Sequence, residues 1–274
     1  MSLIDGLYVE RLGTGPPMLC MHGGMGFDQG TLRPWLEPLN GACELIFYDH
    51  RGNGRSERPA DWSAVDHASW VRDAEVLRET LGLGAMTLFG HSWGGFLAQQ
   101  YALQFPDAVE RLILCSTAPA LDYGATIVAN AEARGTEQQV RMLLDVLSAP
   151  QADDVAFRNV MRAIGSLYFH DPGTSTAAQL FEQIHYSAPA FNRALFDCAP
   201  RFNTLARLHE LAMPVLLLGG ADDWIMPPDH GVRRIHAEVP HAAIRIFEQS
   251  GHFPFVEEQA VFVATVKAWL ARTA

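Results

Sequence analysis

The sequence predicts an α/β fold in which a mostly parallel central sheet is flanked by helices and carries a helical cap insertion. Short, nearly continuous apolar runs alternate along the chain with amphipathic stretches. Continuous apolar runs are typical of parallel strands buried on both faces, and the alternation predicts helical crossovers between them. One long stretch, residues 119–211, shows helical patterns and no convincing strand.

The expected elements are short and follow one another in order. Strands are predicted at Met18–Met21, Leu45–Tyr48, Met86–Phe89, Leu112–Cys115, Val215–Leu218 and Ile244–Phe247. Helices between or after them are predicted at Ala68–Leu81, Gly95–Phe105, Pro228–Glu238 and Phe255–Ala271. Further amphipathic helices, separated by prolines, are predicted at Gln138–Leu147, Val155–Leu167 and Thr176–Tyr186. We therefore expect an α/β core formed by residues 1–118 and 212–274 and a helical cap formed by residues 119–211.

Composition narrows the classes of function. The chain has 274 residues and a net charge of −11, and an acidic surface repels phosphate backbones, so no nucleic-acid partner is expected. The four cysteines are far apart and form no CxxC pair, and no HExxH is present, so neither a metal nor another cofactor is expected. The sequence begins without a basic segment before an apolar stretch, and no apolar run is long enough to span a bilayer. We expect a cytoplasmic protein that acts on a small-molecule ester, amide or short peptide and does not bind a membrane. The sequence leaves open whether the protein forms a homo-oligomer.

A nucleophile is predicted from the segment Gly90-His91-Ser92-Trp93-Gly94, which lies between a predicted strand and a predicted helix. This G-x-S-x-G pattern forms a tight turn that pushes the serine hydroxyl out above the sheet. Glycines on both sides allow close approach of the backbone. The helix that begins there directs N–H groups and a positive dipole end at the site.

A base and an acid are expected after the last two core strands. His252 follows the last predicted strand, and Asp222 and Asp223 follow the strand before it. The chain order Ser, Asp, His is the order expected when a G-x-S-x-G serine carries a triad. We take Asp223 as the orienting acid, because Asp222 suits a turn that hydrogen-bonds its own backbone.

An oxyanion hole is expected in the glycine-rich loop after the first core strand. The amides of Gly24 and Trp93 are the predicted donors, and His22, Gly23 and Met25 flank them as candidate substrate-binding residues.

These residues in this order resemble the α/β-hydrolase family, and more narrowly its proline iminopeptidase branch. The similar segments are His22-Gly23-Gly24-x-Gly26, Phe47-Tyr48-Asp49-x-Arg51-Gly52-x-Gly54-Arg55-Ser56, Ser92-Trp93-Gly94-Gly95 and Gly251-His252-Phe253. The resemblance implies the α/β-hydrolase fold, with Ser92 as nucleophile, Asp223 as acid and His252 as base. Its Asp-x-x-x-Pro spacing also matches Asp223 and Pro227. Met25, His50 and His91 depart from the peptidase pattern and are variants that many esterases share.

A serine hydrolase that cleaves a small carboxylic ester or amide through an acyl-enzyme is the expected function. Proline iminopeptidase-type aminopeptidase and hydrolysis of carbon–carbon bonds in ring-cleavage products stay open as alternatives, as does a catalytically silent binding protein. An aminopeptidase needs a carboxylate for the substrate ammonium, for which Glu182 and Asp197 are candidates. The remaining candidate substrate-binding residues are aromatic and are Tyr123, Phe181, Trp224 and Phe253. The segment from Asp49 to Ser56 is expected to be a turn locked by its own hydrogen bonds rather than a phosphate loop.

Overall fold

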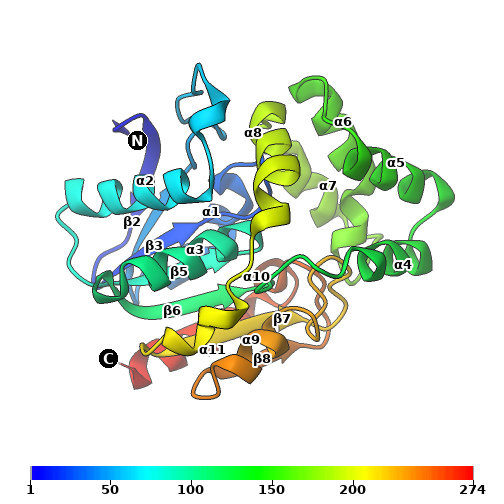
Figure 1. Cartoon of the computed structure of the whole chain (residues 1–274). Helices are drawn as coiled ribbons and strands as arrows, with labels where there is room; N and C mark the ends of the chain where they lie inside the picture. The colour runs from blue at the N-terminus through cyan, green and yellow to red at the C-terminus, as the bar shows by residue number, and fades with distance from the viewer. Residues whose placement is uncertain (1, 274) are drawn as a thin grey trace.

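An eight-stranded sheet forms the centre of the computed structural model, which describes residues 2–273 (Figure 1). The strand order is β1-β2-β4-β3-β5-β6-β7-β8. The pairs β1–β2 and β2–β4 are antiparallel, and the other neighbouring strands pair in parallel. The strands are β1 (Ser2–Ile4), β2 (Leu7–Leu12), β3 (Pro17–Met21), β4 (Glu44–Tyr48), β5 (Met86–His91), β6 (Val109–Cys115), β7 (Val215–Gly220) and β8 (Ala243–Phe247). The predicted α/β fold with a mostly parallel sheet is confirmed.

Helices cover both faces of the sheet and extend beyond one side of it (Figure 1). The helices before β7 are α1 (Arg33–Leu36), α2 (His67–Thr80), α3 (Trp93–Gln104), α4 (Gly124–Arg134), α5 (Glu137–Ser148), α6 (Asp154–Ile164), α7 (Ser175–Glu182) and α8 (Ala188–Asn192). Those after β7 are α9 (Val232–Glu238), α10 (Pro254–Glu257) and α11 (Gln259–Arg272). We call α4 to α8, which lie between β6 and β7, the cap helices.

The central strands are buried on both faces, which explains their continuous apolar sequences. Along β5, Leu88 packs into the core that includes α2, α3 and α9, whereas Phe89 packs into the core that includes α1 and α11. Successive side chains of a strand point to opposite faces of the sheet. Two consecutive apolar residues are therefore both buried only when a hydrophobic core covers each face.

The hairpin of β1 and β2 was not predicted. Asp5 and Gly6 have φ angles of +49° and +77° and form its two-residue turn. Positive φ at both central residues suits an Asp-Gly pair. The hairpin lies at the sheet edge, where Leu7–Leu12 alternates between buried and more exposed positions instead of forming an apolar run.

Several helices differ from their predicted limits. The helix predicted at Thr176–Tyr186 ends at Glu182, and the helix predicted at Pro228–Glu238 begins only at Val232. The last helix is broken at Glu258, between α10 and α11. Two cap helices, α4 and α8, had no predicted counterpart, and α8 continues into a π-helical turn at Arg193–Cys198. Within residues 2–273, no helix has the length and apolar character needed to cross a bilayer.

Candidate active site

Ser92 occupies a strained turn between β5 and α3. Its φ is +54° and its ψ −123°, a backbone conformation that a residue with a side chain rarely adopts. The Ser92 amide donates to the carbonyl oxygen of Cys115 at 2.9 Å, and the Thr117 hydroxyl donates to the Ser92 carbonyl at 2.8 Å. The end of the neighbouring strand β6 therefore fixes the turn, as the G-x-S-x-G pattern requires.

The glycines around Ser92 are required by packing. A Cβ at Gly94 would lie 2.2 Å from the carbonyl oxygen of Met21, and one at Gly90 would lie 2.6 Å from the Cβ of Ala98. A Cβ at Gly23 would lie 2.8 Å from the Cβ of Ser92. The turn and the glycine-rich loop are thus in direct contact, and no side chain fits between them.

Asp223 and His252 meet beyond the carboxyl ends of β7 and β8. Asp223 Oδ2 lies 2.8 Å from His252 Nδ1, and both side chains are buried. Asp223 Oδ1 accepts the amides of Met226 at 2.9 Å and Ile225 at 3.1 Å. These amides hold the carboxylate in place, so it can fix one tautomer of His252. Asp222, the other candidate acid, is exposed and contacts His170 instead.

Ser92 and His252 both line the wall of one cavity. Among residues 2–273, the Ser92 hydroxyl takes part in no hydrogen bond, and only 7% of the residue is exposed. A nucleophile and base without substrate are often further apart than in the reacting complex.

The cavity has a volume of about 150 Å³ and is mainly apolar. Its floor is formed by the Gly23–Phe27 loop and the turn at Ser92, and cap helices α5, α6 and α8 supply much of the rest. Leu147 on α5 lines the cavity and is 39% exposed, so the cavity approaches the surface beside α5. The side chains between residues 119 and 211 that line it are Leu121, Ile127, Leu143, Val146, Leu147, Phe157, Met161, Ile164, Tyr168, Phe191 and Leu195.

The predicted site residues divide into two groups. Besides Ser92 and His252, the cavity wall includes Gly23, Gly24, Met25, Trp93 and Phe253. The candidate substrate-binding residues outside it are His22, Tyr123, Phe181, Glu182 and Trp224. Sequence reasoning did not select Leu143, Ile164 and Leu195, because an apolar side chain on a cap helix has the same pattern whether it faces the cavity or the core.

Four of these five residues are buried outside the cavity, and the fifth, Glu182, lies on the surface. His22 is buried beneath the loop, where its Nδ1 donates to the Gly23 carbonyl at 2.9 Å. The Tyr123 hydroxyl donates to the Met226 sulfur, and Phe181 and Trp224 are fully buried beside Tyr168.

The two candidate carboxylates for an ammonium group lie on the surface. Glu182 pairs with Arg162, and its side chain is 49% exposed. Asp197 pairs with Arg193 at 3.0 Å and is equally exposed. Neither residue lines the cavity.

Two buried imidazoles near the site are held neutral. Burial lowers the pKa of His22 to about 4. Burial, reinforced by the nearby His252, lowers the pKa of His91 well below its usual value. His91 Nε2 lies 3.0 Å from the carbonyl oxygen of His252 and therefore donates to it. The neutral His91 ring thus holds the backbone of His252 through this hydrogen bond.

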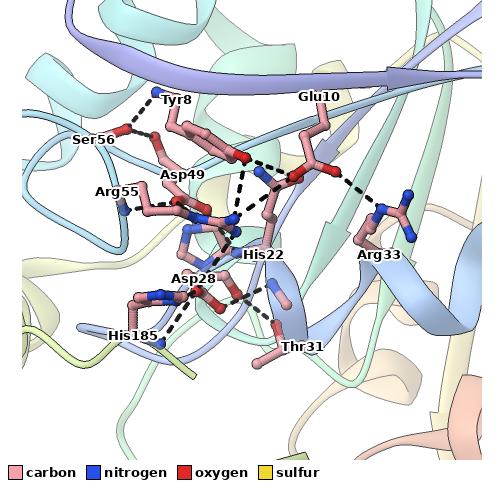
Figure 2. Close-up of polar contacts among 12 residues, drawn as sticks. Tyr8, Glu10, His22, Asp28, Thr31, Arg33, Asp49, Arg55, Ser56 and His185 are labelled. Atoms are coloured by element: carbon pink, nitrogen blue, oxygen red, sulfur yellow. Dashed lines mark hydrogen bonds and ion pairs between the residues drawn. The ribbon is translucent and has the colours of Figure 1, made fainter. Parts of the chain in front are cut away.

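A polar cluster lies behind the glycine-rich loop (Figure 2). Asp28 and Asp49 are both buried, and Arg55 reaches between Asp28 and the Tyr8 hydroxyl. Burial, with Asp28 nearby, raises the pKa of Asp49 to about 6. His185, which follows α7, contacts Asp28 through its Nδ1 at 2.7 Å. The cluster therefore links the loop, the core and the cap.

The turn within this cluster is locked by its own hydrogen bonds, as predicted. The Ser56 hydroxyl donates to the Asp49 carbonyl at 2.6 Å, and the Arg55 amide donates to Asp49 Oδ2 at 2.8 Å. The loop is held by the same turn, because the Gly26 amide donates to Asn53 Oδ1 and the Gln29 amide to Asp49 Oδ1. In the described part of the chain, no group of three or more His, Cys, Asp or Glu residues is arranged to hold a metal ion.

Comparison with known proteins agrees with this architecture. A family model described as alpha/beta hydrolase fold matches residues 16–259. An uncharacterized protein of Mycobacterium tuberculosis (strain ATCC 25618 / H37Rv) is 33% identical over 269 residues, which cover 95% of this chain and 77% of that protein. The proline iminopeptidase PfmaB of Pestalotiopsis fici is 27% identical over 265 residues, covering 94% and 92%. The structure of an esterase from Exiguobacterium antarcticum has a TM-score of 0.75 at 21% identity, covering 97% and 95%.

The chain belongs to the α/β-hydrolase family, because the family model spans most of its length. It is a hydrolase of this fold, and its sequence is similar to the proline iminopeptidase-like branch.

Proposed function

We propose that this chain is a serine hydrolase that cleaves a small carboxylic ester or amide through an acyl-enzyme, with a preference for apolar acyl groups. One observation carries the proposal: the strained Ser92 and the Asp223-paired His252 share the wall of a single apolar cavity.

In the first half of the proposed reaction, His252 Nε2 takes the proton of the Ser92 hydroxyl while Oγ attacks the substrate carbonyl carbon. The carbon–oxygen double bond opens, and its electron pair moves to the oxygen. Asp223 stays ionised, accepts the proton of His252 Nδ1 and stabilises the imidazolium that forms.

In the second half, the tetrahedral intermediate collapses and expels the leaving group, which takes the proton from His252 Nε2. Water then repeats the sequence: it gives a proton to His252, attacks the acyl carbon and releases the acid with Ser92 restored.

The amides of Gly24 and Trp93 are the proposed donors to the oxyanion. Neither amide has an acceptor among residues 2–273, and both residues line the cavity beside Ser92. Trp93 also begins α3, whose N-terminal end favours negative charge. Loss of one such donor typically reduces turnover by ~10²–10³.

The lining of the cavity favours apolar acyl groups. Aliphatic and aromatic side chains dominate it, and within the described chain it includes no Asp, Glu, Lys or Arg. An apolar cavity of this volume accommodates a molecule about as large as benzene. Each methylene buried there contributes about 0.8 kcal/mol, which corresponds to about fourfold in kcat/KM if the contact persists in the transition state.

Aminopeptidase activity is the second candidate, and the similarity to proline iminopeptidases favours it. The substrate ammonium would enter an apolar cavity whose described lining contains no carboxylate. Burial of an unpaired charge is costly, so we rank this activity below ester hydrolysis.

A substrate panel tests the proposal. We expect kcat/KM for p-nitrophenyl esters to rise about fourfold per methylene from acetate until the cavity is filled, and proline p-nitroanilide to react far more slowly. Ser92→Ala should lose ~10⁶ in turnover. Faster cleavage of the anilide, reduced by Glu182→Ala, would favour the aminopeptidase, and an active Ser92→Ala variant would refute the serine mechanism.

A further inference from the structure

Glu257, the last residue of α10, bridges two segments beside the active site. Its Oε2 accepts the amide of Gly251 at 2.7 Å, and its Oε1 accepts the amide of His170 at 2.6 Å. Gly251 immediately precedes His252, whereas His170 lies between α6 and α7. One carboxylate therefore joins the loop of the proposed base to the cap.

The same two segments are joined at His252 itself. The His252 amide donates to the Tyr168 carbonyl at 2.7 Å, so one backbone hydrogen bond joins the base to the segment Tyr168–His170, and Glu257 joins the same two segments through its carboxylate. Arg134 holds this segment from α4 by donating to the Phe169 carbonyl at 2.6 Å. A shift of the segment would therefore move the backbone of the base.

Glu258 offers an internal comparison. Its Oε2 accepts the amide of Gln249 at 2.9 Å and the hydroxyl of Ser250 at 2.8 Å. Glu258 therefore holds the loop that precedes His252, but both of its partners, Gln249 and Ser250, belong to the core, and neither hydrogen bond joins the core to the cap. Glu257 thus differs from its neighbour in tying the loop to the segment that contacts His252.

We propose that Glu257 is a positioning residue that keeps His252 aligned with Ser92 by locking the base loop onto the cap segment Tyr168–His170. This role rests on the proposed function, because it assumes that His252 activates Ser92. Charged acceptors form the stronger amide hydrogen bonds, so the ionised carboxylate is the effective form.

The environment of Glu257 sets the conditions for a test. Burial raises its pKa to about 7, although the two amide bonds and the nearby His170 and Arg134 oppose the shift. The carboxylate is therefore mostly ionised at pH 8.

Reaction with diisopropyl fluorophosphate at pH 8 measures how well His252 activates Ser92, because phosphorylation requires the same transfer of the hydroxyl proton to the base. Glu257→Gln leaves one oxygen for two amide donors and turns an NH₂ group toward one of them. We expect labelling and kcat to fall together by about 10- to 100-fold with KM within twofold, since a displacement of about 1 Å can cost about 10² in rate. Glu258→Gln should stay within about threefold of wild type. The NMR resonance of the His252 Nδ1 proton should shift or broaden only in Glu257→Gln.

Each of the following results would contradict this role. Glu257→Gln could react as fast as wild type, or both variants could slow equally in proportion to their loss of thermal stability, which would indicate general stabilisation alone. A wild-type protein that is not labelled would overturn the proposed function and the positioning role with it. If Glu257→Gln does not fold, Glu257→Asp gives the same comparison, because its shorter carboxylate cannot span the amides of Gly251 and His170: slower labelling supports the role, and an unchanged rate refutes it.

Discussion

Replacing Asp223 by Asn tests the most constrained part of the proposed mechanism. The carboxylate accepts three hydrogen bonds, from His252 Nδ1 and from the amides of Ile225 and Met226. Asn has one oxygen, and if that oxygen keeps the two amides, its NH₂ group faces His252. Nδ1 must then accept, which places the imidazole proton on Nε2 and prevents it from taking the proton of Ser92.

The expected loss of kcat is ~10⁴, the size found for the equivalent change in a serine protease, or about 5 kcal/mol in transition-state stabilisation. Initial rates with p-nitrophenyl butyrate measure it, with circular dichroism as the check on folding. Asp222→Asn is the matched control, because Asp222 is exposed and contacts His170 rather than His252. It should retain activity within a few-fold. An Asp223→Asn enzyme with more than a tenth of wild-type kcat would refute the assignment of the acid.

Two further predictions concern stability. Gly94→Ala should destabilise the fold by about 3 kcal/mol or more, because its Cβ would meet two backbone carbonyls, of Met21 at 2.2 Å and His22 at 2.4 Å. Gly41→Ala, with no atom within 4 Å of its Cβ, should change stability by at most about 1 kcal/mol; equal urea midpoints for the two variants would contradict the packing argument. Burial lowers the pKa of His67 to about 4, so the unfolded chain binds more protons between pH 6.5 and 4 and stability falls as the pH decreases through that range. From pH 7 to 5 the wild type should therefore lose about 2 kcal/mol more than His67→Gln in urea unfolding, and a pH-independent difference would show that His67 is not the linked group.

The core of the fold was predictable because its central strands are buried on both faces and therefore have continuous apolar sequences. The hairpin β1–β2 was missed because the strands of a hairpin at the sheet edge need only one apolar face, although Asp5-Gly6 is a strong turn signal. The break at Glu258 was also missed, since the helical pattern continues across it.

The candidate site was predictable where local backbone geometry demands a residue type, as at Gly90, Ser92 and Gly94. Its apolar wall was not, because which cap side chains face the cavity depends on how the cap helices pack. Phe181 shows the difficulty: it is aromatic and close in space to Phe253, yet it is buried against Gly165 rather than in the cavity. Glu257 could not be distinguished from Glu258 by sequence, since only the fold brings His170 to it.

Covalent labelling of the nucleophile tests the central claim most directly. Treated with a fluorophosphonate, the protein should form one phosphorus–oxygen bond at Ser92 with loss of fluoride, and peptide mass spectrometry should place a single adduct there in wild type and none in Ser92→Ala. An adduct on another residue, or an unlabelled protein that still hydrolyses esters, would contradict the assignment of Ser92 as the nucleophile.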